Sequence, residues 1–272
     1  MNLGDSRDDD INEFNSPIGC FDTSAVTTMN SMFRGASSFN QTVNTWDTSS
    51  VTDMNSLFHN ANFFNQPVIT WNTSSVTNMG SMFSGAKAFN QPVDSWDTSS
   101  VNDMFEMFRG AKEFNQCVST WAGKTNNNVN TEFMFNGSGC PDKENFNPNV
   151  GPWCQEESDV CSPPPTVSPR PSTTPSQSPS IFPTNDFWRP GDSCEEYCKQ
   201  FGDRPVIQDG INGGRNIFTD QLVEYFNDIQ EFEMGSRAPL NCWNTSLVTN
   251  MRCYFNSKEN SCAFEDQGFN EP

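Results

Sequence analysis

The stretch FNQPVITWNTSSVTNMGSMFSGAKA, residues 64–88, decides the fold because close copies of it stand on both sides. Its first residue recurs every 25 residues, at Phe14, Phe39, Phe64, Phe89 and Phe114. The other large apolar residues keep this spacing: Trp46, Trp71, Trp96 and Trp121 (Phe21 in the first copy), then Val26, Val51, Val76 and Val101, then Met29, Met54, Met79 and Met104, and a closing Phe33, Phe58, Phe83 and Phe108. Such a period predicts a repeat protein.

Each unit contains signals for a short strand, a turn and a short helix. Asn-Gln-Pro-Val allows at most a strand of a few residues, because proline cannot donate a ladder hydrogen bond. Asp-Thr-Ser-Ser is typical of a turn. In the second copy, Met54, Leu57 and Phe58 have helical spacing, and Thr52 or Ser50 can cap that helix. A glycine or Asn60 stands where each helix would end (Gly35, Gly85, Gly110).

One unit alone buries too little apolar surface to offset the entropy of ordering 25 residues. Stacking supplies the missing contacts, so we predict a solenoid of the leucine-rich-repeat type with short parallel strands and short helices in each coil. Coils at strand spacing would lie about 4.8 Å apart. The asparagine after each leading Phe is expected to form a ladder that bonds the backbone of adjacent coils (Asn15, Asn40, Asn65, Asn90, Asn115).

The composition changes along the chain and predicts six segments. Residues 1–13 form an acidic tail, 14–137 five repeats, and 138–161 a cysteine-rich cap in which FNPNVGPW restarts the pattern. Residues 162–185 form a disordered Pro/Ser/Thr-rich linker, 186–242 a small cysteine-containing α+β lead-in with a helix over 218–233, and 243–272 the start of a second array. Because FNEP (269–272) opens another unit, we expect a truncated C-terminus.

Charge and cysteine content predict the compartment. A formal net charge of −19 argues against nucleic acid as a partner, and no stretch is apolar enough to enter a membrane. Ten cysteines beside a single histidine favour disulfides over zinc, hence an extracellular or cell-surface location. The disulfide candidates are Cys140, Cys154, Cys161, Cys194, Cys198, Cys242, Cys253 and Cys262, and the glycosylation candidates are Asn40, Asn72, Asn136 and Asn244. MNLGDSRDDD is no signal peptide, so we expect an incomplete N-terminus.

Catalytic and metal sites are not indicated. Any triad would need His59, which lies in a column that also holds Arg34, Ser84 and Arg109, as expected of a variable, solvent-facing position. Asp47 and Asp97 are interpreted as turn caps, since a stacked column offers no cleft for a carboxylate pair. SRDDDIN (6–12) could bind calcium, but a solvated tail is favoured; INGGRN (211–216) is a turn. We therefore predict no cofactor, no metal and no enzyme activity.

Positions that vary between units are the candidates for a recognition surface. They are the two residues before each Trp (Asn44, Thr45, Ile69, Thr70, Asp94, Ser95, Ser119, Thr120) and the column Arg34, His59, Ser84 and Arg109. Such a strip would bind a protein or a glycan through many weak contacts. Rows of Thr and Ser hydroxyls leave ice binding open as a remote alternative.

The unit as a whole resembles the repeat of about 25 residues in BspA-like surface proteins, carried by W-[DN]-T-S-S-V-T-x-M, M-F-x-G-A and F-N-Q, over residues 14–137 well and 243–272 more loosely. The resemblance implies a variant leucine-rich-repeat solenoid on a cell surface, with a role in adhesion or binding, and it transfers no functional residues. The alternatives are a targeting module of a larger secreted hydrolase and a structural wall protein. The ligand, the anchor and the oligomeric state stay open.

Overall fold

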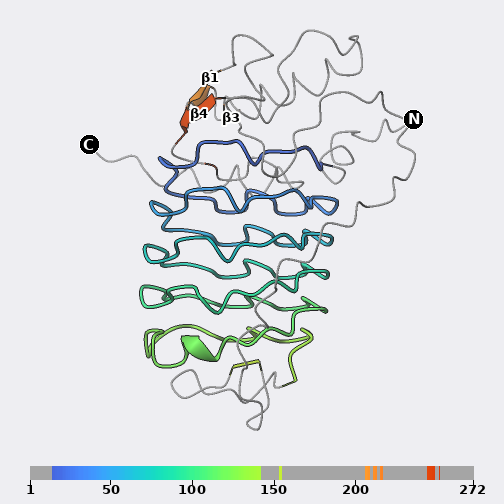
Figure 1. The fold of residues 1–272 in the computed structure, drawn as a ribbon. Coiled ribbons are helices and arrows are strands. Elements are labelled where there is room, and N and C mark those ends of the chain that lie inside the picture. The colour runs from blue at the N-terminus through green and yellow to red at the C-terminus, as the bar shows by residue number, and fades with distance from the viewer. Residues whose placement is uncertain are drawn as a thin grey trace, which may run out of the picture.

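The computed structural model describes residues 14–141, 153–154, 206–208, 211–212, 215–216, 244–248 and 251. Its elements in chain order are a single 3-10 turn, η1 (Ser119–Trp121), and the strands β1 (Val206–Gln208), β2 (Ile211–Asn212), β3 (Arg215–Asn216) and β4 (Asn244–Leu247). β1 pairs with β4 in parallel, and β2 pairs with β3 in antiparallel orientation. Most of the chain with described structure therefore lies outside regular helices and strands (Figure 1).

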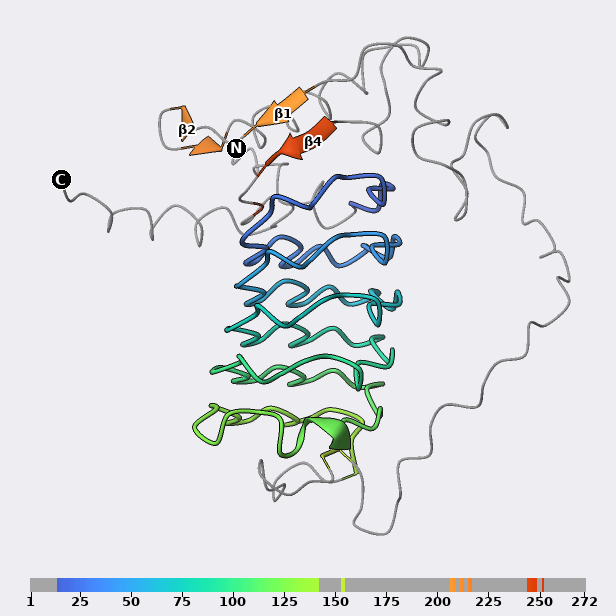
Figure 2. The same cartoon turned by 60° about the vertical axis from the view of Figure 1, so that its left-hand side comes forward.

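Residues 14–141 wind through successive coils that stack on one another, as Figures 1 and 2 show. Single parallel bridges join each coil to the next: Thr28 to Asp53, Asp53 to Asn78, Asn78 to Asp103, and Asp103 to Asn130. In the first four coils the bridging residue stands directly before the first Met of the unit. The parallel pairing predicted for Asn-Gln-Pro-Val lies here instead. In that segment the backbone amide of each Asn from Asn40 to Asn115 donates to the Asn side-chain oxygen of the preceding coil rather than to a backbone carbonyl.

The short helix predicted after each turn is wrong for the described coils, which have consecutive turns there. In the second coil, Ser56 has a φ of 55°, a left-handed conformation that interrupts a right-handed helix. Alternate amides then point to different partners. The amides of Met54, Ser56 and Phe58 donate to carbonyls of the next coil at 2.8–2.9 Å, whereas Leu57 and His59 close local turns. Bonding between coils thus replaces bonding within a helix.

Aromatic columns run through the core as the periodicity predicts. The leading Phe rings stack with centroids 5.7–6.0 Å apart, the closing Phe rings at 5.4–5.8 Å and the Trp rings at 6.3–6.4 Å. Each Trp Nε1 also donates to a carbonyl of the preceding coil, for example Trp71 to Val43 at 2.9 Å. The columns therefore combine apolar packing with satisfied polar groups.

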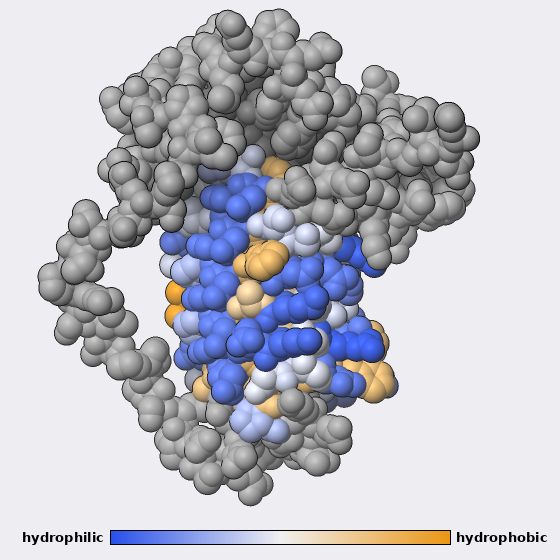
Figure 3. Space-filling model, turned by 90° about the vertical axis from the view of Figure 1, so that its right-hand side faces the viewer, coloured by the Kyte–Doolittle hydropathy of each residue, from blue (hydrophilic) through white to orange (hydrophobic). Residues whose placement is uncertain are grey.

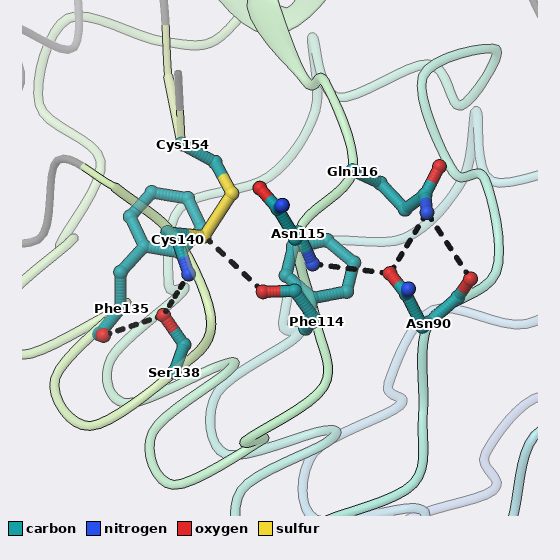
Figure 4. The surroundings of a disulfide bond; sticks show 8 residues. All are labelled: Asn90, Phe114, Asn115, Gln116, Phe135, Ser138, Cys140 and Cys154. Atoms are coloured by element: carbon teal, nitrogen blue, oxygen red, sulfur yellow. Dashed lines mark hydrogen bonds between the residues drawn. A yellow bond between two sulfur atoms is a disulfide. The ribbon is translucent and has the colours of Figure 1, made fainter. Parts of the chain in front are cut away.

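The C-terminal end of the stack is closed by residues from the predicted cap. Cys140 and Cys154 form a disulfide, and the Sγ of Cys140 lies 3.7 Å from the carbonyl oxygen of Phe114 (Figure 4). Trp153 is fully buried and meets Trp121 edge-on, at 6.1 Å and 87°. A ring turned across the column cannot continue its parallel stacking, so Trp153 ends the Trp column. The predicted tail (1–13) and linker (162–185), the helix predicted over 218–233 and residues 155–161 lie outside the described residues.

Candidate recognition surface

The residue before each Trp uses its hydroxyl inside the stack. Thr45, Thr70, Ser95 and Thr120 each donate to a backbone carbonyl oxygen of the preceding coil, at the residue two before Trp, or two before Phe21 in the first coil. Thr70 reaches the carbonyl of Asn44 at 2.8 Å, and Ser95 that of Ile69 at 3.2 Å. These four side chains are part of the predicted surface, but their donors hold adjacent coils together.

The residue two before each Trp forms what we term the variable column: Asn44, Ile69, Asp94 and Ser119. The carbonyls of Asn44, Ile69 and Asp94 accept hydroxyls of the next coil. The side chain at this position changes from amide to aliphatic to acid to hydroxyl. Asn44 is exposed, Ile69 is 40 % exposed, and Asp94 and Ser119 are half-buried. The described structure thus presents four chemically different side chains at one repeated position.

The second predicted row is not uniformly exposed, which corrects its interpretation as a solvent-facing column. Arg34 and His59 are half-buried, and Ser84 is buried at 6 % exposure. Ser84 is short and stands between the longer side chains of His59 and Arg109 in the column. Only Arg109 is exposed, and it forms an ion pair with Glu106 three residues earlier. We therefore leave Ser84 out of the candidate surface.

The Asp-Thr-Ser-Ser segment is a hydrogen-bonded turn, as predicted. The carboxylate of Asp47 accepts the amide of Ser49 at 2.9 Å, and Asp97 accepts that of Ser99 at 3.0 Å. The Ser49 side chain, followed by its backbone amide, holds the pKa of Asp47 below its usual value of 3.8. Ser99 lowers the pKa of Asp97 in the same way. Both carboxylates therefore act as turn caps.

The Ser and Thr hydroxyl rows lie along the stack, but many of their donors are used. Ser50, Ser75 and Ser100 donate to carbonyls of the preceding coil at 2.9–3.1 Å, and Thr52 and Thr77 do so at 3.2 Å. The buried Thr48 and Thr73 donate to carbonyls of the next coil, both at 2.9 Å. An ice-binding face needs free, flat hydroxyl rows, so these bonds weaken that alternative.

The asparagine ladder is confirmed. The side-chain oxygen of Asn65 accepts the amide of Asn90 at 2.9 Å and the side-chain amide of Gln91 at 3.0 Å. The same pair of bonds recurs from Asn15 to Asn90 along the column. This side chain therefore joins coils and is not part of the candidate surface.

Cysteines of the coils were missing from the predicted disulfide set. Cys20 and Cys117 are each disulfide-bonded, in addition to the pair Cys140–Cys154. No free cysteine occurs among the described residues. The even total of ten was the available signal. The other candidates (Cys161, Cys194, Cys198, Cys242, Cys253, Cys262) lie outside the described residues.

Three of the four glycosylation candidates are exposed: Asn40, Asn72 and Asn136. The fourth, Asn244, belongs to β4. In the described part of the chain, no three His, Cys, Asp or Glu side chains are grouped so that they could hold a metal ion. No helix described by the structure has the length and apolar character to cross a membrane.

Exposed aromatic residues were not anticipated. Phe63 is 65 % exposed in a position that holds Ser38, Ala88 and Glu113 in other copies. Phe133 is 50 % exposed and meets Phe105 edge-on at 6.0 Å. Phe63 differs from the small or charged residues at the same position of other units, and this difference was visible in the sequence. Figure 3 shows apolar residues scattered on a largely hydrophilic face of the stack rather than gathered in one continuous patch.

Comparison with known families agrees with this repeat architecture. The model of the family described as "Mycoplasma protein of unknown function, DUF285" matches residues 8–70, 40–153 and 219–269. The chain belongs to this family. Two of the DUF285 matches overlap over residues 40–70, as expected where similar units follow one another. Neither the search of curated proteins nor that of solved structures found a match. Membership in the DUF285 family supports a repeat protein and leaves its function open.

Proposed function

We propose that the protein is a non-catalytic repeat protein of the cell surface or extracellular matrix, which binds a protein or a glycan through the variable column. The observation that carries this proposal is the contrast between adjacent positions. Thr70 and Ser95 are locked to carbonyls of the preceding coil, while the residues beside them, Ile69 and Asp94, differ in chemistry. A constant scaffold that displays changing side chains is how solenoids build extended binding surfaces.

The disulfides support the proposed location. All four cysteines that the structure describes are oxidised, and Cys140–Cys154 fastens the cap of the stack. Disulfides form and persist in oxidising compartments, which favours an extracellular protein. The resemblance to BspA-like surface proteins supports the same location and an adhesive role. Cell-surface placement, adhesion and the leucine-rich-repeat type of solenoid are all parts of this proposal.

The column also indicates what kind of ligand would fit. Its four side chains follow the stack axis at one position in each coil, so an extended ligand lying along the axis can contact several coils. A net charge of −19 disfavours polyanions. A neutral or basic polymer, either a glycan chain or an extended peptide, can lie along several coils and is not repelled by the negative net charge. Each contact should contribute about 1 kcal/mol or less.

A combined glycan and peptide array tests this proposal. We expect the wild-type chain to select a small set of neutral or basic ligands reproducibly. A variant with Asn44→Ala, Ile69→Ala and Asp94→Ala should bind that set at least about tenfold more weakly, as expected for a summed loss above about 1.4 kcal/mol. Lys87→Ala with Lys112→Ala, two exposed residues outside the column, is the matched control and should bind normally. No selective binding, or equal losses in both variants, would contradict the proposal.

A further inference from the structure

Residues 244–248 and Met251, here termed the edge segment, lie at the N-terminal end of the stack. β4 lies between β1 and the first coil in both views (Figures 1 and 2). The hydroxyl of Thr245 donates to the carbonyl oxygen of Asp22 at 3.0 Å, although the two residues are 223 positions apart in the sequence. The amide of Met251 donates to the carbonyl oxygen of Thr28, also at 3.0 Å. The segment predicted to begin a second array therefore contacts the first coil of this one.

These contacts have the register of a regular coil. The hydroxyl of Thr23 donates to a carbonyl of the second coil at 2.9 Å, as that of Thr245 does to Asp22 of the first. The amide of Met29 likewise donates to the second coil at 3.0 Å, as that of Met251 does to the first. Thr245 and Met251 thus stand for Thr23 and Met29, each 222 positions earlier (245 − 23 and 251 − 29). The edge segment takes the place of a coil that would precede the first.

The position of Cys20 in the unit carries a bond to the preceding coil in each later coil. Hydroxyl side chains occupy this position there, and each donates to a carbonyl of the preceding coil (Thr45, Thr70, Ser95, Thr120). The first coil has the half-buried Cys20 instead, and Cys20 is disulfide-bonded. For the first coil, the preceding coil is the edge segment. The partner of Cys20 is therefore expected on the chain that leads into that segment.

The register assigns this place to Cys242, which lies outside the described residues. Cys242 follows Cys20 by 222 positions (242 − 20), the offset that also relates Thr245 to Thr23. It stands two residues before Asn244, so the chain holds the two Cα atoms within about 7 Å of each other. Paired strands lie about 4.8 Å apart, and a disulfide needs Cα atoms about 4.4–6.8 Å apart. Equivalent positions of neighbouring coils therefore have the spacing of a disulfide.

The other cysteines outside the described residues do not share this position. Two of them precede β1, a strand that β4 separates from the first coil (Figure 2). Two follow Met251, beyond the opposite end of the edge segment from Asn244. The fifth follows the Cys140–Cys154 disulfide, which closes the far end of the stack. These five are Cys194, Cys198, Cys253, Cys262 and Cys161.

We propose that Cys20 and Cys242 form a disulfide that fastens the edge segment to the first coil. It replaces the hydroxyl-to-carbonyl bond that this position makes between later coils. The two thiols lose two protons and two electrons to a protein or small-molecule disulfide, which is reduced to its two thiols. Both ends of the stack then have a covalent clasp, and reduction of Cys20–Cys242 leaves the first edge held by noncovalent contacts alone. This inference is independent of the ligand of the variable column.

Peptide mapping of the unreduced wild-type chain tests the pairing. The protein is unfolded with its free thiols blocked and is then digested with trypsin. Trypsin releases residues 8–34, which contain Cys20 alone, and residues 238–252, which contain Cys242 alone. We expect mass spectrometry to find these two peptides joined and to find them separate after reduction. Peptide 8–34 joined to any other peptide would overturn the proposal.

Thiol counts in two variants give an independent test. Cys20→Thr introduces the residue that later coils carry at this position, and the unfolded, unreduced variant should have one free thiol more than the wild type. Adding Cys242→Thr should remove that thiol, because both members of the pair are then absent. An extra thiol that persists in the double variant would show that Cys20 pairs elsewhere and would overturn the proposal.

Amide hydrogen exchange in the same double variant shows whether the disulfide holds the edge closed. The amide of Met251, which donates to the first coil, should exchange at least about tenfold faster than in the wild type, because removal of a disulfide lowers the stability of the segment that it fastens. The amide of buried Met54 in the second coil is the internal control and should be unchanged. Unchanged exchange at Met251 would overturn the fastening role proposed for the disulfide.

Discussion

At the scale of single residues, the unit depends on backbone conformations that few side chains adopt. Gly85 and Gly110 have φ values of 73° and 70°, and Asn60 takes the same place at 59°. We predict that Gly110→Ala lowers the free energy of unfolding by about 1 kcal/mol, from backbone strain alone. Gly85→Ala should cost more, because the added Cβ would lie 2.2 Å from Oδ1 of Asn60, whereas Gly110 has no atom within 3.7 Å.

Urea unfolding of the two glycine variants measures this difference. Gly110→Asn is the control and should be better tolerated than Gly110→Ala, because asparagine adopts the left-handed conformation more readily than alanine and already does so at position 60. Equal destabilisation by Gly85→Ala and Gly110→Ala would show that the contact with Asn60 is unimportant.

The turn carboxylates predict a dependence of stability on pH. The pKa values of Asp47 and Asp97 are lowered in the folded chain, so their ionised forms stabilise it above the usual pKa of 3.8. This contribution is lost as the pH falls through their folded pKa values. In the variant Asp47→Asn with Asp97→Asn the turns should persist, since Asn72 caps the third turn by accepting the amide of Ser74.

Urea unfolding of this double variant and the wild type between pH 7 and 2.5 isolates the two carboxylates. The gap in unfolding free energy between the proteins should narrow below pH 3.8 and be constant above pH 5. A gap that does not change with pH would contradict the role assigned to Asp47 and Asp97.

At the scale of elements, the asparagine ladder joins one coil to the next. Asn65→Ala would remove the acceptor of the Asn90 amide, which lies at a half-buried residue, and of the Gln91 side chain. We predict a loss of about 1–3 kcal/mol in unfolding free energy, since a donor left without a partner costs its desolvation. Asn65→Asp keeps an acceptor oxygen and should lose much less. Comparable losses in chemical denaturation would contradict the ladder's role.

The element scale also shows where sequence reasoning succeeds and fails. The aromatic columns and the asparagine ladder follow from the 25-residue period, because a side chain repeated in register must meet its own copy. The helix at Met54–Phe58 does not follow. Its apolar spacing fits a helix, but Ser56 adopts a left-handed conformation and alternate amides bond the next coil. Propensity is local, and here contacts between coils override it.

The candidate surface could also be predicted only in part from the sequence. Their variation can be read from the sequence, so the variable column was predictable. Burial was not: Ser84 is hidden although its column holds two arginines and a histidine. Whether a short side chain is covered depends on the longer ones beside it, which only the stacked arrangement reveals.

At the scale of the whole molecule, the described coils are covered at both ends by segments that depart from the regular unit. Trp153 and the Cys140–Cys154 disulfide close one end, and residues 244–248 with Met251 lie on the other. The repeat motif that includes Thr245, Val248 and Met251 was readable in the sequence, but its position was not, because Thr245 lies 223 positions after Asp22. Sequence similarity between units predicts that they stack without specifying which edge each one meets.

The central claim is that backbone bonds between coils hold this stack in register, and residue-resolved amide hydrogen exchange tests it most directly. Thr52 and Thr77 are exposed, yet their amides donate to carbonyls of the preceding coil at 2.8 Å. The nearby amides of Ser50 and Ser75 have no acceptor in the described structure. We predict slow exchange at Thr52 and Thr77, comparable with buried Met54, and fast exchange at Ser50 and Ser75. Equally fast exchange at Thr52, Thr77, Ser50 and Ser75 would contradict the stacked register, since Thr52, Thr77 and Ser50 are exposed and Ser75 is half-buried.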